Sequence, residues 1–171
     1  MQDENVTWHA WPLRVRYQET DQMGVVYHMN YLNWLEIGRT EAIRALGVAY
    51  RDLEAEGLFL PLTDAQMAFK RAARYDDEVV VFTRVAEFGA LRIRFESEAR
   101  KVELSFWQSL CSAQGQKNAP WFAEPQGELL VSGNTRHVWL NRDWQPTRLD
   151  HAHPGLYALL KSLRDMGESA L

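Results

Sequence analysis

Residues 12–47 read PLRVRYQETDQMGVVYHMNYLNWLEIGRTEAIRALG. Their pattern changes from that of a strand to that of a helix, and this change decides the fold. Apolar and charged side chains alternate with a period of two from Pro12 to Tyr17, which predicts a half-buried strand. The backbone can turn at Met23-Gly24, because glycine tolerates conformations that other residues avoid. The side chain of Asn30 can then cap the first amides of a helix, so we expect a helix to begin between His28 and Asn30.

The helix expected after this turn carries a stripe of mostly small residues. One face holds, at offsets of 4, 3, 4 and 3, the residues Tyr31, Leu35, Gly38, Ala42 and Ala45. Glycine inside a helix costs about 1 kcal/mol relative to alanine. Gly38 therefore indicates that another backbone approaches this face closely, as a sheet wrapped over the helix would.

The chain beyond the helix reads mostly as strands up to about Leu140. The patterns predict a short helix over Tyr50–Glu56, a loop over Ala113–Gly127, a C-terminal amphipathic helix over Leu156–Leu163, and extended segments over Leu58–Arg74, Glu78–Glu87, Leu91–Phe95, Glu96–Ser112 and Glu128–Leu140. A strand, a long helix and then several strands predict an α+β fold, in which an antiparallel sheet packs against one main helix. Because one helix cannot shield a broad sheet on all sides, we expect a second copy to pair with it.

Length and composition predict one globular domain over residues 1–171, with a core over about 12–145 and a helical tail over 146–171. The formal net charge of −4 supplies no general attraction for nucleic acid or anionic lipid, so neither partner is expected. The only cysteine, Cys111, excludes an intramolecular disulfide. We found neither a secretory signal nor an apolar run long enough to span a membrane, and we expect a soluble cytoplasmic protein.

The turn between the first strand and the helix combines an acid with an anion-binding element. Asp21 lies at the end of the strand, and the helix that follows presents free N–H groups and the positive end of its dipole. Such donors stabilise the developing charge on a carbonyl oxygen, and a carboxylate can attack that carbonyl or activate water. The combination indicates hydrolysis of an activated acyl group. Each residue also has an ordinary structural interpretation, with Asp21 as a turn residue and Tyr17, Tyr27 and His28 as packing residues.

The same segment resembles a known family through the run Tyr17-x-x-Thr20-Asp21-x-x-Gly24-Val25-Val26-Tyr27-His28-x-Asn30-Tyr31-Leu32, followed by Glu36, Arg39, Thr40 and Glu41. It is similar to the hotdog-fold acyl-CoA thioesterases of the 4-hydroxybenzoyl-CoA thioesterase type, especially their Tol–Pal-cluster branch. The resemblance implies a central helix wrapped by an antiparallel sheet. It also implies a homodimer or dimer of dimers with active sites between subunits, an acyl-CoA substrate, and no metal or redox cofactor.

The resemblance also assigns roles to residues of this chain. It makes Asp21 the catalytic carboxylate, either as a nucleophile or as a general base for water. The backbone N–H of His28 becomes the donor to the thioester carbonyl, while the His28 side chain and Tyr17 orient substrate, water or Asp21. Substrate-binding positions are expected at Gly24, Val25, Tyr27 and Asn30. The helix residues pair at a spacing of three, Glu36 with Arg39 and Glu41 with Arg44, and predict ion pairs.

Two other functions stay open. The first is a hotdog hydratase, whose loop resembles this one but places the histidine five residues after the acid, whereas Asp21 and His28 are 28 − 21 = 7 apart. The second is a non-catalytic hotdog domain that binds acyl-CoA or serves as an assembly partner. The spacing argues against the hydratase, and the acid at the end of the strand favours catalysis over binding alone.

Three further groups of residues could bear on function. A metal site is conceivable at Asp150, His151 and His153, although exposed histidines near a chain end are more often solvated. Basic residues that could contact coenzyme A phosphates are Lys70, Arg71, Arg92 and Arg94, although such residues on strands often face solvent. The segment 100–127 is longer than the usual hairpin of the family and carries Phe106, Trp107, Trp121 and Phe122, which indicates buried aromatics, a subunit contact or a lid.

Overall fold

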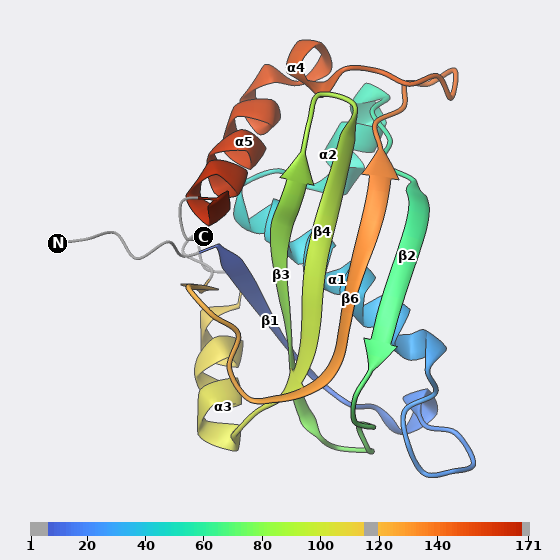
Figure 1. The fold of residues 1–171 in the computed structure, drawn as a ribbon, viewed down its shortest axis with the longest axis vertical. Helices are drawn as coiled ribbons and strands as arrows, with labels where there is room; N and C mark the ends of the chain where they lie inside the picture. Colours follow the sequence, from blue (N-terminus) through green and yellow to red (C-terminus); the bar gives the residue numbers. More distant parts are fainter. Residues whose placement is uncertain (1–6, 115–119, 169–171) are drawn as a thin grey trace, which may run out of the picture.

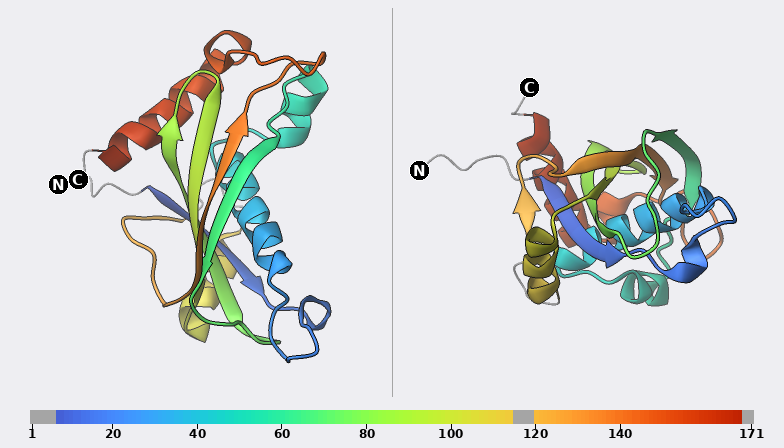
Figure 2. Two further views of the ribbon diagram at one scale, coloured as in Figure 1. Left: turned by 45° about the vertical axis from the view of Figure 1, so that its right-hand side comes forward. Right: turned by 90° about the horizontal axis from the view of Figure 1, so that it is seen from below.

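The computed structural model describes residues 7–114 and 120–168. The helices and strands follow one another as β1 (Trp8–Arg14), a 3-10 turn (Tyr17–Glu19), α1 (Met29–Ala45), α2 (Tyr50–Glu56), β2 (Leu62–Phe69), β3 (Glu78–Phe88), β4 (Arg92–Lys101), α3 (Leu104–Ala113), β5 (Trp121–Phe122), β6 (Glu128–Val138), α4 (Leu149–Ala152) and α5 (Pro154–Glu168). The strands form one antiparallel sheet in the order β2-β6-β4-β3-β1-β5. The sheet wraps around α1, as Figures 1 and 2 show, which confirms the expected α+β architecture.

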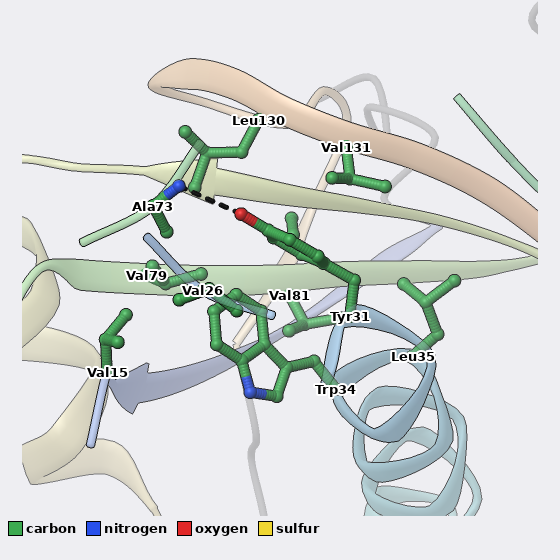
Figure 3. Packing of buried hydrophobic residues seen from close by; sticks show 11 residues of the cluster. Val15, Val26, Tyr31, Trp34, Leu35, Ala73, Val79, Val81, Leu130 and Val131 are labelled. Atoms are coloured by element: carbon green, nitrogen blue, oxygen red, sulfur yellow. Dashed lines mark hydrogen bonds between the residues drawn. The ribbon is translucent and has the colours of Figure 1, made fainter. Parts of the chain in front are cut away.

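The core between α1 and the sheet is built from alternate residues of the strands, because successive side chains of a strand point to opposite faces. Val79 and Val81 of β3 pack with Tyr31, Trp34 and Leu35 of α1. Figure 3 shows these rings and branched side chains filling the space between helix and sheet. The hydroxyl of Tyr31 also accepts a hydrogen bond of 2.9 Å from the buried N–H of Ala73 and ties the segment after β2 to the helix.

The α1 stripe of small residues meets β3 at its closest point. A Cβ atom added to Gly38 would lie 2.6 Å from Oγ1 of Thr83 and 2.7 Å from Cγ1 of Val81. No real Cβ atom packs so tightly against its neighbours, so the helix could not approach β3 this closely with a larger residue. The expectation of a close backbone approach at Gly38 is confirmed.

We expect Gly38→Ala to lower the free energy of unfolding by about 1–3 kcal/mol, because the added methyl group overpacks this contact. Helix propensity alone predicts the opposite sign, a gain of about 1 kcal/mol. Urea unfolding of the wild type and the variant measures the change, with Asn33→Ala on the exposed face of α1 as the control. An unchanged or higher stability of Gly38→Ala would show that α1 does not press against β3 at this point.

Several boundaries predicted from the sequence are wrong. The first strand is Trp8–Arg14 and not Pro12–Tyr17, because the chain leaves the sheet after Arg14 and enters the 3-10 turn at Tyr17. Only Leu62–Phe69 of the long extended segment 58–74 is a strand. The strand predicted to continue over Glu96–Ser112 ends at Lys101 and gives way to helix α3. The predicted helices over Tyr50–Glu56 and 156–163 are confirmed, the latter within α5.

Helix α3 and the short strand β5 cover the face of the sheet that α1 does not reach. Val80 and Phe82 of β3 point to this face and are buried with Trp8, Val102 and Leu110. The aromatic residues of the insertion pack against their own chain: Phe106, Trp107 and Phe122 join this cluster, and the ring of Trp121 lies 5.2 Å from that of His9. The predicted loop over 113–127 therefore includes a strand, and its residues 115–119 lie outside the described part of the chain.

Helix α5 closes the other end of the core on the same face as α1. Leu156 and Leu160 pack with Ile43 of α1 and with Phe95 of β4. The β2 edge of the sheet is left open, since β2 is exposed along its length apart from half-buried Met67. The opposite edge is covered, because β5 pairs with β1. The open edge is central to the interpretation of the site.

Candidate active site

The loop between β1 and α1 is held in place by a buried carboxylate. Glu19 is 6% exposed and accepts hydrogen bonds from the indole N–H of Trp34 at 3.0 Å and from the backbone N–H of Arg16 at 2.8 Å. Burial raises the pKa of Glu19, but the hydrogen bonds from Trp34 and Arg16 outweigh burial and lower its pKa overall. The carbonyl oxygen of Glu19 accepts the N–H of Tyr27 and the side-chain amide of Asn30. Glu19 thereby fixes both ends of the loop to the start of α1.

Asp21 lies at the tip of this loop and organises a tight turn. Its N–H donates to the carbonyl of Val25 at 2.8 Å, and its carbonyl accepts the N–H of Gly24 at 2.9 Å. Its Oδ1 accepts the N–H of Met23 at 2.8 Å. Gly24 has a φ of +74°, which confirms the predicted turn and explains the glycine. Among the described residues no donor bonds Oδ2 of Asp21, so this oxygen is free to act on another molecule.

Helix α1 begins at Met29, within the range that the sequence predicts. In the part of the chain that the structure describes, no hydrogen bond uses the N–H of His28 or of Met29. These are the donors that a carbonyl oxygen with developing negative charge requires. The expected cap by Asn30 is wrong, because Asn30 lies inside the helix and its side chain donates to the carbonyl of Glu19 at 2.8 Å.

The predicted aromatic residues form an exposed group beside the loop. Tyr27 is 44% exposed and its ring centroid lies 4.4 Å from that of His28. The ring of His28 in turn lies 6.5 Å from that of Phe69, the last residue of β2. Tyr17 is 79% exposed and contacts the ring of Tyr75 at 5.7 Å. No contact in the described structure joins Tyr17 to Asp21 or His28, so one chain alone does not bring Tyr17 to the other two.

Two residues of this region were missed by sequence reasoning. Glu19 has a signal in hindsight, because a glutamate three residues after Arg16 can accept the Arg16 N–H, as in one arm of a capping box, and this bond is present. Phe69 has no such signal, since its place beside His28 depends on how β2 crosses the end of α1. Both residues position the site and make no bond to Asp21.

The charged residues of α1 form the predicted ion pairs. The guanidinium of Arg39 bonds the carboxylate of Glu36, with Nε 2.8 Å from Oε2, and also donates to the hydroxyl of Tyr50 at 2.7 Å. Nε of Arg44 lies 3.0 Å from Oε2 of Glu41. Arg39 is 6% exposed, so its pairing fixes α2 against α1. These pairs lie along the helix and away from its amino end.

The basic residues proposed for phosphate contacts do not gather in one place within a chain. Arg71 pairs with Glu128 at 2.7 Å, and Arg94 pairs with Glu87 and Glu96, each at 2.9 Å. Lys70 and Arg92 have no ion pair among the described residues. Lys70 follows the end of β2, whereas Arg92 begins β4 at the opposite end of the sheet. A ligand that contacted both within one chain would have to extend along the whole length of the sheet.

The candidate metal residues near the C-terminus have other partners. Arg148 bonds the carboxylate of Asp150 at 2.7 Å. Nε2 of His151 lies 3.9 Å from that carboxylate, and Nδ1 of His153 accepts the N–H of Leu156 at 3.1 Å. Over residues 7–114 and 120–168, no group of three or more His, Cys, Asp or Glu side chains is arranged to hold a metal ion. No described helix is long and apolar enough to cross a membrane.

Comparison with known proteins identifies the fold family. The sequence profile of the thioesterase-like superfamily matches residues 15–147, from the end of β1 to the segment after β6. The chain belongs to this superfamily. The match includes the whole loop around Asp21, helix α1 and strands β2 to β6. The resemblance to the hotdog-fold thioesterases is thus confirmed at the level of the superfamily, and so is membership of a thioester hydrolase family.

Several bacterial thioesterases are similar to this chain. YneP of Bacillus subtilis, which is provisionally named an acyl-CoA thioesterase, is 42% identical over 143 residues, or 83% of this chain and 87% of that protein. The acyl-CoA thioesterase YbgC of Haemophilus influenzae is 38% identical over 96 residues, or 56% of this chain and 71% of that protein. A DHNA-CoA thioesterase from Staphylococcus aureus has a similar structure, with a TM-score of 0.74, 29% identity, and coverage of 94% of this chain and 95% of that one.

Proposed function

We propose that this chain hydrolyses an acyl-coenzyme A thioester to a carboxylic acid and free thiol, with Asp21 as the catalytic carboxylate. The observation that carries the proposal is that one loop holds a carboxylate oxygen with no described partner and the free N–H of His28. A carboxylate beside backbone donors is the arrangement that acyl transfer to water requires. The relatives named acyl-CoA thioesterases support coenzyme A as the thiol.

The geometry supports the following chemistry. The N–H of His28, at the positive end of the α1 dipole, donates to the thioester oxygen and stabilises the negative charge that develops on it. Asp21 either takes a proton from water as the water oxygen attacks the carbonyl carbon, or attacks that carbon itself and forms an anhydride that water then cleaves. In both cases the C–S bond breaks and the thiolate takes up a proton. The sum is one water consumed and one acid and one thiol released.

We assign the remaining predicted residues to positioning and binding around this centre. Gly24 and Val25 form the turn that presents Asp21, and Asn30 holds the loop against α1 through the carbonyl of Glu19. The exposed rings of Tyr27 and His28 offer flat faces against which the acyl group or the pantetheine arm can pack. Tyr17 would contribute only through a partner subunit or a bound ligand. We place the reaction in the cytoplasm, because Cys111 is a free thiol.

We also propose that two copies pair through β2 to form a homodimer, which can associate further into a dimer of dimers. An edge strand that exposes its backbone groups is a template for pairing with another chain. Strand β2 is eight residues long and exposed at nearly every position, and Phe69 at its end contacts His28. Pairing there would cover the exposed aromatic rings and enclose the site with residues of both copies.

We expect Ala65→Lys, in the middle of β2, to shift the protein from dimer to monomer and to reduce turnover with it. Two lysines facing each other across the two-fold axis repel, and edge lysines are a natural device against strand pairing. Analytical ultracentrifugation and thiol release measure both effects. Ala158→Lys, on the exposed side of α5, is the control. A variant that stays dimeric and active would place the subunit contact elsewhere.

The experiment that tests the activity is free-thiol release from short, medium, long and aromatic acyl-CoA thioesters. Hydrolysis of one of these classes is the expected result and names the acyl group. Addition of water to the double bond of an enoyl-CoA, with the thioester left intact, would instead support a hydratase. Binding without any turnover would support an acyl-CoA-binding domain.

A further inference from the structure

An exposed pair of stacked aromatic rings lies far from the Asp21 loop within one chain. Trp144 is 66% exposed, and its ring lies parallel to that of Phe59, with an interplanar angle of 7° and centroids 6.1 Å apart. Phe59 covers one side of the indole, so an indole that is still two-thirds exposed presents its other face to solvent. The pair forms a flat, open platform.

The backbone at Trp144 is strained, and the fold gains no buried side chain in return. Trp144 has a φ of +57°, in the left-handed region that large side chains rarely adopt. The turn is held by Asn141, whose Oδ1 accepts the N–H groups of Asp143 and Gln145 at 3.0 Å and whose carbonyl accepts the N–H of Trp144. Glycine or asparagine would fit this position without strain. A strained residue that is kept exposed is a feature of binding sites.

The platform lies at the beginning of the open edge strand. Phe59 bridges Leu140, just before the turn that carries Trp144, and strand β2 begins three residues after Phe59 at Leu62. Figures 1 and 2 show the turn 141–146 and the loop 15–28 at opposite ends of the β2 edge. When two β2 strands pair antiparallel, the first residue of each lies near the last residue of the other. The platform of one copy then lies on the same side as Phe69 and His28 of its partner. The three residues from Phe59 to Leu62 place it about 10 Å beyond the end of the paired strands.

We infer that Trp144 and Phe59 form a stacking platform for the adenine base of the coenzyme A whose thioester is bound in the partner's site. The inference rests on the proposed function and on the pairing through β2. Coenzyme A carries its base at the far end of a long pantetheine arm from the sulfur. The thioester would lie at the Asp21 loop of one copy, and the arm would run across the subunit boundary to the platform of the other.

The chemistry of the platform favours a planar base over a phosphate. Arg142, the nearest cation in the turn, already donates to the carbonyl of Ala55, and Asp143 beside it carries the opposite charge. The turn itself therefore has no excess of positive charge to hold a phosphate. An indole face attracts a base by stacking, which is insensitive to net charge.

The test is the affinity of the dimer for free coenzyme A and for pantetheine, which lacks the nucleotide, measured by calorimetry for wild type, Trp144→Ala and Trp144→Phe. We expect Trp144→Ala to weaken coenzyme A binding by roughly tenfold and to leave pantetheine binding unchanged, since loss of one stacking partner has an effect of this order. Trp144→Phe should restore most of the affinity. Equal weakening for both ligands, no weakening, or a wild type that does not bind coenzyme A would overturn the inference.

Two further measurements separate a binding role of Trp144 from a structural one. The melting temperature of Trp144→Ala should not fall, because the substitution removes no buried side chain and keeps the turn that Asn141 holds. Its sedimentation should stay dimeric, whereas dissociation would make Trp144 a subunit contact and overturn the platform. Thiol release by wild type tests the proposed function independently. A protein that hydrolyses acyl-CoA but binds coenzyme A equally well with and without Trp144 would refute only the platform.

Discussion

Asp21→Asn is expected to lower kcat for thioester hydrolysis by about 10²- to 10⁴-fold, the range that a positioned general base or nucleophile contributes. The fold should persist, because the amide oxygen of asparagine can accept the Met23 N–H that Oδ1 of Asp21 accepts in the wild type. The amide, however, neither attacks a carbonyl nor removes a proton from water. Steady-state thiol release gives kcat, and titration with a non-hydrolysable acyl-CoA thioether gives the affinity, which should change little.

The control for this variant is Asp52→Asn, because Asp52 is an exposed acid on α2 away from the loop. It should leave both kcat and affinity at the wild-type values. Turnover of Asp21→Asn at the wild-type rate would remove Asp21 from the reaction. A parallel loss of affinity and melting temperature would instead show that Asp21 only shapes the turn.

Acidification from pH 6.5 to 4.5 is expected to destabilise the protein through two buried histidines. Burial lowers the pKa of His9 from 6.5 to about 4, and burial, with a smaller effect of the nearby Arg39 charge, lowers that of His137 to about 4. Each ring is only 1% exposed, so the folded protein keeps it neutral while the unfolded chain takes up a proton. Stability is thus full above pH 6.5 and falls as the pH drops toward 4, by about 2 to 3 kcal/mol for each histidine over this interval.

Urea unfolding at several pH values measures this loss. The double variant His9→Gln/His137→Gln should be less stable at pH 7 but should show a flatter dependence between pH 6.5 and 4.5. His151→Gln, in which the replaced imidazole is exposed and hydrated in both states, is the control and should follow the wild-type curve. Protonation of the buried carboxylate Glu19 destabilises the folded protein only at lower pH. The pKa of Glu19 is about 4.5 in the unfolded chain and is lowered by folding. An unchanged slope in the double variant would show that neither histidine is buried neutral.

The fold was predictable from the sequence where periodicity and a special residue agreed. The α1 stripe and Gly38 pointed to the helix and to its contact with β3, and both are present. Helix α3 was mistaken for a strand because its apolar residues, including the adjacent pair Phe106 and Trp107, fit a short strand as well as a helix. What decides between them is the apolar face of the sheet at Val80 and Phe82, which an amphipathic helix buries and which no local pattern reveals.

The candidate site was predictable in its centre and not at its edges. The turn that holds Asp21 and the start of the helix near His28 depend on residues close in the sequence, so residue spacing could predict both. The position of Phe69 beside His28 depends on sheet order, and Tyr17 is exposed with no contact to Asp21 or His28 within the described residues. The left-handed backbone at Trp144 goes against the preference of its residue type, so no propensity argument could have found the platform.

Hydrolysis of acyl-CoA through Asp21 is tested most directly by measuring binding and thiol release on one preparation of the wild-type protein. Each acyl-CoA of the panel is supplied, thiol release is followed, and the affinity of the corresponding thioether is measured. We expect at least one acyl-CoA to be bound and hydrolysed, and we expect Asp21→Asn to bind the same ligand without releasing thiol. Wild-type protein that binds acyl-CoA tightly and releases no thiol from any of them would contradict it and would identify a binding domain.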